Sequence, residues 1–147
     1  MQIIVLLITL VGFSCVSEIM PTDQGKPVIV EVRCGGDDNL TQGVCRNVYN
    51  EFASTADFVI TDEDNTATLI VYIPTNVNWK QRGKRTRVFY KVEFLSNNEK
   101  QLSKKKGECW DDDFKTCASQ VLKHARSAAR KLKYCPAPKM HTVKISL

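Results

Sequence analysis

The sequence predicts an α+β fold, a small two-layer domain in which a mainly antiparallel sheet of four to five strands carries two helices packed on one face. Two patterns support this class. Apolar residues keep helical spacing from Phe114 to Leu132, and apolar and charged residues alternate from Val88 to Phe94. Short turns between the middle strands favour antiparallel pairing, because parallel strands need long crossover connections.

The chain opens with an apolar run from Ile3 to Phe13 and carries no charged side chain before Glu18. An apolar core of about 11 residues is typical of a signal peptide and too short for a membrane span, which needs about 20. We therefore expect residues 1–14 to be a signal peptide, residues 15–26 a polar tether and residues 27–147 a single disulfide-containing domain.

The end of the leader allows two kinds of processing. Gly12-Phe13-Ser14-Cys15 is similar to a bacterial lipobox, and a lipid on Cys15 would anchor the domain to a membrane. An ordinary signal-peptidase cut after Ser14 or Ser17 would release it instead. Both alternatives predict an exported protein, periplasmic or anchored to the outer membrane if the source is bacterial, and secreted otherwise.

The first half of the domain contains one strand, one helix and two further strands. Pro27–Arg33 is rich in β-branched residues and predicts a strand. Val44, Val48 and Phe52 recur every four residues and predict a helix over 40–53. Two further strands are expected at residues 58–60 and 68–73, with an acidic turn between them that lacks the spacing of a calcium loop.

The second half is predicted to hold a long strand and the longest helix. Residues 74–84 are predicted to form a loop. The lysine-rich stretch 96–107 is predicted to form a hairpin or loop, with a returning strand near Gln101 and Leu102. The three aspartates 111–113 precede the helix, where carboxylates cap free amides. Alternating apolar residues over 141–147 predict a final edge strand.

Six cysteines are many for a chain of 147 residues and indicate an oxidising compartment. A Cys34–Cys45 bridge would join the first strand to the first helix, and a Cys109–Cys117 bridge would join the second helix to the strand before it. Cys135 lies too far along the helix to reach Cys117. Without a Cys-x-x-Cys motif and with only two histidines, the sequence predicts no metal site and no cofactor. The disulfide candidates are Cys34, Cys45, Cys109, Cys117 and Cys135.

The charges are unevenly distributed, although the net charge is only +5. Residues 80–106 contain ten basic residues against Glu93 and Glu99, whereas residues 37–64 contain seven acidic residues against Arg46. The basic stretch suits an anionic surface, such as lipid headgroups, lipopolysaccharide or peptidoglycan, or an envelope protein. Nucleic acid is disfavoured for an exported protein. The candidate binding residues are Lys80, Arg82, Lys84, Arg85, Arg87, Lys104, Lys105 and Lys106.

No catalytic set emerges from the sequence. His124 and Cys117 are seven residues apart on one helix, about 10 Å, which exceeds hydrogen-bond reach. The leading hypothesis is therefore a non-enzymatic exported envelope protein, as a lipoprotein or a soluble form, that acts as a binding or accessory module. Two alternatives remain: a small secreted basic hydrolase or nuclease-like toxin that uses His124 and His141, and a secreted inhibitor or immunity-type module.

Overall fold

The computed structural model describes residues 26–63 and 65–134. In chain order, the elements are β1 (Val28–Cys34), α1 (Asn39–Ala53), β2 (Phe58–Ile60), β3 (Leu69–Ile73), β4 (Asn78–Arg82), β5 (Arg85–Ser96), β6 (Gln101–Trp110) and α2 (Phe114–Tyr134). The predicted signal peptide, Cys15, Cys135, His141 and the expected strand over 141–147 lie outside the described residues.

The α+β class predicted from the sequence is confirmed, with a six-stranded mixed sheet in place of four to five strands. β5 is the longest strand and pairs with β6 along one edge. On its other edge, it pairs with β4 near its start and with β3 near its end. β1 then lies between β3 and β2. The strand that sequence analysis missed entirely is β4, because its five residues are exposed and carry no apolar alternation.

Two of the strand pairs are parallel. β1 runs parallel to both β2 and β3, and α1 provides the crossover from β1 to β2 that a parallel pair requires. The three pairs that β5 makes are antiparallel, and two of them close through short turns. β6 is a full strand of 10 residues, where the sequence indicated only a short return, because its lysines hide the strand pattern.

The core lies between one face of the sheet and both helices. On β5, Val88, Tyr90, Val92 and Phe94 point to this face and are buried. They pack with the apolar stripe of α2, and α1 adds Val44, Val48 and Phe52. The helical and alternating patterns of the sequence therefore meet in a single core, and the opposite face of the sheet has no helix over it among the described residues.

Two disulfides join the sheet to the helices. Cys34 at the end of β1 bonds Cys45 in α1, with Cα atoms 6.4 Å apart, and Cys109 on β6 bonds Cys117 in α2, with Cα atoms 5.4 Å apart. These are the two pairings that the sequence spacing favours. Each crosses from a strand to an early turn of a helix, so each fixes how that helix lies on the sheet.

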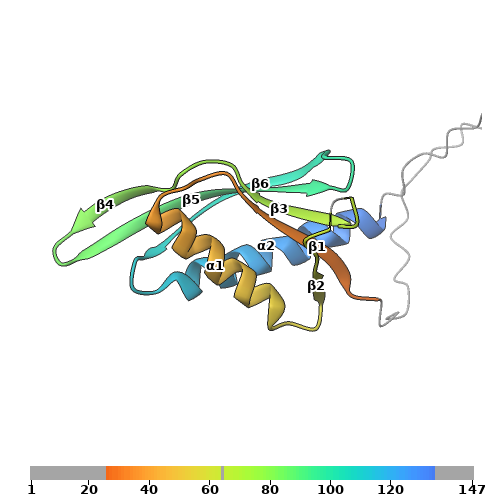
Figure 1. Ribbon diagram of the computed structural model, residues 1–147, viewed down its shortest axis with the longest axis horizontal. Coiled ribbons are helices and arrows are strands. Elements are labelled where there is room, and N and C mark those ends of the chain that lie inside the picture. The colour runs from red at the N-terminus through yellow and green to blue at the C-terminus, as the bar shows by residue number, and fades with distance from the viewer. Residues whose placement is uncertain (1–25, 64, 135–147) are drawn as a thin grey trace, which may run out of the picture.

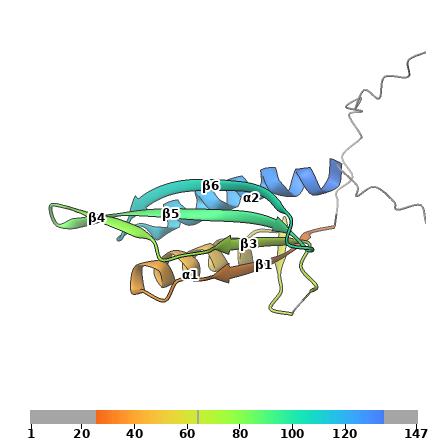
Figure 2. The ribbon, with the colours of Figure 1, turned by 90° about the horizontal axis from the view of Figure 1, so that it is seen from above.

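The β4–β5 hairpin extends beyond both helices, as Figures 1 and 2 show from two directions. The start of β1 and the end of α2 lie at the opposite end of the domain. Gly83 permits the tight hairpin turn, since its φ is +61° and Lys84 beside it has a negative φ. No helix within 26–63 and 65–134 is long and apolar enough to cross a membrane.

Candidate binding surface

The basic residues of the hairpin gather on the sheet face that the helices leave open. Lys80 lies directly opposite Arg87 across the β4–β5 ladder, and Arg82 lies opposite Arg85. Because alternate residues of a strand share a face, these four lie on the side away from the buried Val88 and Tyr90. On β5 and β6, Phe89 and Trp110 occupy the same side. We call these six residues the hairpin face: Lys80, Arg82, Arg85, Arg87, Phe89 and Trp110.

The other predicted binding residues lie at three different places. Lys84 is in the turn at the tip of the hairpin. Lys104 and Lys106 lie on the open face of β6, opposite Glu93 and Lys91. Lys105 is opposite the buried Val92 and therefore on the helix side, where its charge reaches His124. The sequence cluster is thus split by strand alternation, and only part of it forms one surface.

Trp110 supports the two arginines of the hairpin face. The guanidinium carbons of Arg85 and Arg87 lie 4.4 and 4.7 Å from the centre of its ring. Arg85 also bonds Asp112 at 2.5 Å, and Arg87 bonds Glu108, which raises the pKa of Arg87 and lowers that of Glu108. These contacts hold both guanidinium groups in place, and each group has further N–H donors beyond the one in its ion pair.

A shallow hollow of about 470 Å³ lies in this region, lined by Arg82, Arg87, Phe89, Glu108 and Trp110. Phe89 is 38% exposed, an unusual fraction for a large apolar side chain at the centre of a strand. The hollow therefore combines cationic donors with an aromatic floor. Phe89 and Trp110 were not among the sequence candidates, although the alternation that places Val88 in the core also places Phe89 on the outside.

Lys80 and Arg82 make no ion pair with the residues that the structure describes. Each instead faces a like charge on the neighbouring strand, an arrangement that destabilises a ladder. Two such pairs in succession concentrate positive charge at the end of the molecule farthest from the start of β1. An anionic ligand would relieve this repulsion.

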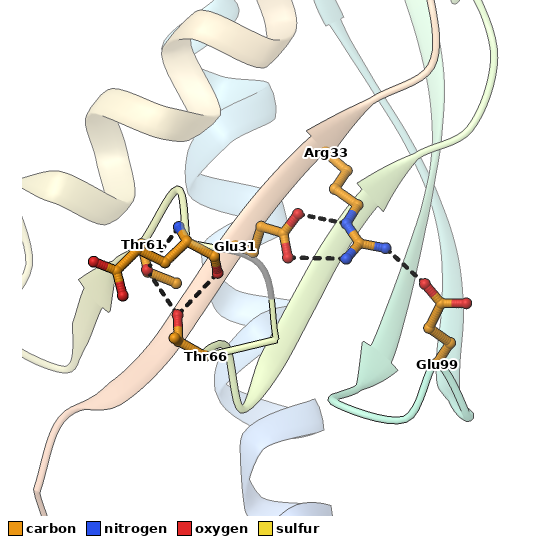
Figure 3. Close-up of polar contacts among 6 residues, drawn as sticks. Glu31, Arg33, Thr61, Thr66 and Glu99 are labelled. Atoms are coloured by element: carbon orange, nitrogen blue, oxygen red, sulfur yellow. Dashed lines mark hydrogen bonds and ion pairs between the residues drawn. The ribbon is translucent and has the colours of Figure 1, made fainter.

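The opposite end of the open face has its charges paired. Figure 3 shows Arg33 on β1 between two carboxylates: Glu31 accepts from Nε at 2.5 Å and from Nη2 at 3.0 Å, and Glu99 accepts from Nη1 at 2.9 Å. The hydrogen bonds that Arg33 donates, first to Glu31 and then to Glu99, raise the pKa of Arg33. Further along, Lys104 bonds Glu93 at 2.7 Å. Positive charge here is matched within the chain.

The aspartates before α2 have separate roles, whereas the sequence suggested capping for all three. Asp113 caps the helix by accepting from the backbone N–H and the hydroxyl of Thr116. Asp111 accepts from the backbone N–H of Thr86, which lowers its pKa, and Asp112 pairs with Arg85. Two of the three carboxylates therefore brace β5 close to the turn of the hairpin.

His124 lies half-buried on α2, and its pKa is lowered first by burial and then by Lys105 and Lys123. Its predicted catalytic partner His141 is outside the described residues. Tyr90 of β5, which faces the helices, donates a hydrogen bond to Gln120 at 3.0 Å, and burial raises its pKa to about 12. Among residues 26–63 and 65–134, no group of His, Cys, Asp or Glu side chains has a metal-binding arrangement.

No protein-family model matches the chain, and no curated protein matches it. Solved structures do. A PelC variant dodecamer from Paraburkholderia phytofirmans is 11% identical and has a TM-score of 0.48, covering 65% of this chain and 86% of that chain. A minor lipoprotein from Acinetobacter baumannii is 6% identical, with a TM-score of 0.42 and coverages of 69% and 94%. An uncharacterized lipoprotein B from Nitrosomonas europaea is 11% identical, with a TM-score of 0.36 and coverages of 78% and 89%.

Two of these three proteins are thus bacterial lipoproteins. At these identities and TM-scores, the similarity carries no inference about what the present chain binds, how it assembles or whether it catalyses a reaction.

Proposed function

We propose that this chain is a non-enzymatic exported envelope module that binds an anionic partner through the hairpin face. The observation that carries the proposal is the double row of like charges, Lys80 opposite Arg87 and Arg82 opposite Arg85, on a sheet face that neither described helix covers. Trp110 and two acidic side chains hold Arg85 and Arg87 in position before any partner arrives. Such preorganisation reduces the entropy lost on binding.

Export is supported by the apolar leader and by the two disulfides, which persist in oxidising compartments. Anchoring through a lipidated Cys15 is part of the proposal. Intact mass of the mature protein tests it, because a lipidated form carries the added mass of its acyl chains on Cys15. A mass that matches an unmodified N-terminus at Cys15 or Glu18 would leave export intact and remove the anchor.

The position of the hairpin supports a partner other than the anchoring membrane itself. Lys26 lies 11 residues after Cys15, a segment that spans at most about 40 Å when fully extended. The hairpin projects from the end of the domain opposite the start of β1. An anchored domain standing away from its membrane would present the hairpin face outward, toward a neighbouring envelope component.

Charge reversal tests the binding role. The variant with Arg82→Glu, Lys84→Glu and Arg85→Glu should lose most of its affinity for acidic peptides, lipopolysaccharide or peptidoglycan, by about tenfold or more, and wild-type binding should weaken as salt rises. A matched control reverses Lys115, Lys123 and Arg130, which are exposed on α2, and changes the net charge equally. Equal loss in both variants, or binding that ignores salt, would contradict the proposal.

A further inference from the structure

Among the strands that the structure describes, none pairs with the outer edge of β4. β4 pairs with β5 on one side, and Arg82 and Arg85 close the ladder next to the two-residue turn. In such a hairpin, the closing residues exchange backbone hydrogen bonds, and the pattern then alternates along the strand. The backbone groups of Asn78, Lys80 and Arg82 therefore point to β5, and those of Trp79 and Gln81 point outward. Neither Trp79 nor Gln81 makes a backbone hydrogen bond to another described segment.

A strand added at this edge would meet a different environment on each face. On the open face its side chains would lie beside Lys80 and Arg82, which are two residues apart and hence about 7 Å apart along the strand. On the other face, its side chains would lie beside Trp79, which is 62% exposed because the hairpin extends past the helices. The edge therefore favours a partner strand in which acidic side chains, on the open face, alternate with apolar side chains, on the other face.

The same charges exclude a second copy of this strand. Two β4 edges paired with each other would bring Lys80 and Arg82 of both copies together on one face, and like charges opposite each other destabilise a ladder. Basic residues on an edge strand commonly prevent such self-pairing. An acidic strand removes this penalty, because its carboxylates pair with the two cations.

We propose that β4 accepts an extended acidic segment of a partner protein as an additional strand, with carboxylates at alternate positions beside Lys80 and Arg82 and an apolar side chain over Trp79. This inference rests on the proposed function and specifies its partner. Backbone hydrogen bonds to Trp79 and Gln81 would supply affinity, and the alternating charges would supply specificity.

Two synthetic peptides of the same composition test the alternation. One alternates glutamate and valine over seven residues, and the other groups the glutamates before the valines. Calorimetric titration of the oxidised protein should give an affinity about tenfold higher for the alternating peptide, a difference of about 1.4 kcal/mol. Binding should also slow hydrogen exchange at the amides of Trp79 and Gln81.

Two further measurements separate strand addition from simple charge attraction. Gln81→Pro removes one outward N–H, and Gln81→Ala removes only the side chain that contacts Gly83 and Thr86. We expect the proline variant to lose affinity and the alanine variant to keep it. N-methylation of the peptide removes backbone N–H donors. N-methyl groups on the alternate residues whose N–H groups face β4 should abolish binding, and N-methyl groups on the residues between them should not. This test leaves the protein unchanged.

The outcomes distinguish the inference from the proposed function. Equal, salt-sensitive binding of both peptides would overturn strand addition and leave the hairpin face as an anion-binding surface. Binding to vesicles that contain anionic lipid, with no preference between the peptides, would also overturn it and assign the surface to a membrane. Failure of the protein to bind any of these anionic probes would overturn the proposed function as well.

Discussion

The two ends of the open sheet face carry the same residue types with opposite consequences. On β1, Arg33 lies between Glu31 and Glu99, so its charge is used within the fold. At the hairpin, Lys80 and Arg82 face Arg87 and Arg85, so charge accumulates. The difference lies in the carboxylates within reach. Arg33 has Glu31 two residues away on its own strand and Glu99 in the β5–β6 turn, whereas Lys80 and Arg82 have no carboxylate partner among the described residues. A cationic surface of this kind is therefore identified by which lysines and arginines lack a carboxylate partner, rather than by how many there are.

The two ends also differ in what supports them. β1 and β2 pack against α1, and β5 and β6 pack against α2, whereas β4 lies beyond both helices with all five residues exposed. The hairpin is therefore held mainly by β5, by the carboxylates of Asp111 and Asp112 and by the bridge at Cys109. Four pairs of variants test this contrast between a packed end and a braced one.

The largest effect is expected for Gly107→Ala on β6. A Cβ there would lie 2.2 Å from the hydroxyl of Tyr90, which is buried in the core. The clash should lower the free energy of unfolding by about 2–3 kcal/mol, measured by urea denaturation. Gly83→Ala, at the hairpin turn, meets no neighbouring atom, and its left-handed φ costs only about 1 kcal/mol. Similar losses at both positions would contradict the contrast.

Removal of the Cys109–Cys117 bridge by alanine at both positions should cost about 2–3 kcal/mol, from the entropy of the loop that it closes. Because Cys109 pairs with Val88 at the base of the hairpin, hydrogen exchange should accelerate in β4 and β5. The matching variant without Cys34–Cys45 should lose comparable stability and leave hairpin exchange nearer to wild type. Identical exchange profiles in the two variants would show that neither bridge braces the hairpin specifically.

A smaller effect distinguishes the aspartates before α2. Asp113→Ala removes the helix cap and should lower the free energy of unfolding by about 1 kcal/mol. Asp112→Ala removes an exposed ion pair and should change stability little. It should instead loosen Arg85 and thereby weaken anion binding. Thermal unfolding and a binding titration of both variants provide the measurement, and a reversed order of stabilities would contradict these roles.

The smallest effect tests the charge contrast itself. Arg33→Gln should lower the free energy of unfolding by less than about 1 kcal/mol, because it breaks a partly exposed pair with Glu31. Arg82→Gln should leave stability unchanged or raise it slightly, because it relieves repulsion with Arg85. Anion binding should instead weaken more in Arg82→Gln than in Arg33→Gln. The comparison fails if Arg82→Gln destabilises the protein as much as Arg33→Gln does.

Much of the fold could be predicted from the sequence, because apolar periodicity records which residues enter the core. The stripe of α2 and the alternation of Val88, Tyr90, Val92 and Phe94 predicted both elements closely. β4 escaped prediction because neither of its faces is buried, so no periodicity marks it. Most of β6 escaped for a related reason, since three successive lysines occupy its centre.

The candidate surface was predicted in part. Basic residues of the hairpin were identified from their number, but their grouping depends on pairing that begins at the turn after Arg82. The β5–β6 register places Lys104 and Lys106 on the open face and Lys105 on the helix side. A shift of one residue would exchange the two faces. Trp110 was missed because its partners, Arg85 and Arg87, are distant in sequence and reach it only through the β5–β6 ladder.

The chain has two tryptophans, and both lie at the hairpin: Trp79 on β4 and Trp110 beneath the arginines. Intrinsic fluorescence excited at the indole band therefore reports on this end alone, without a label. A ligand on the open face should alter the emission of Trp110, and a strand added at β4 should shift that of Trp79 to shorter wavelength. Single Trp→Phe variants would turn one optical signal into two independent sensors.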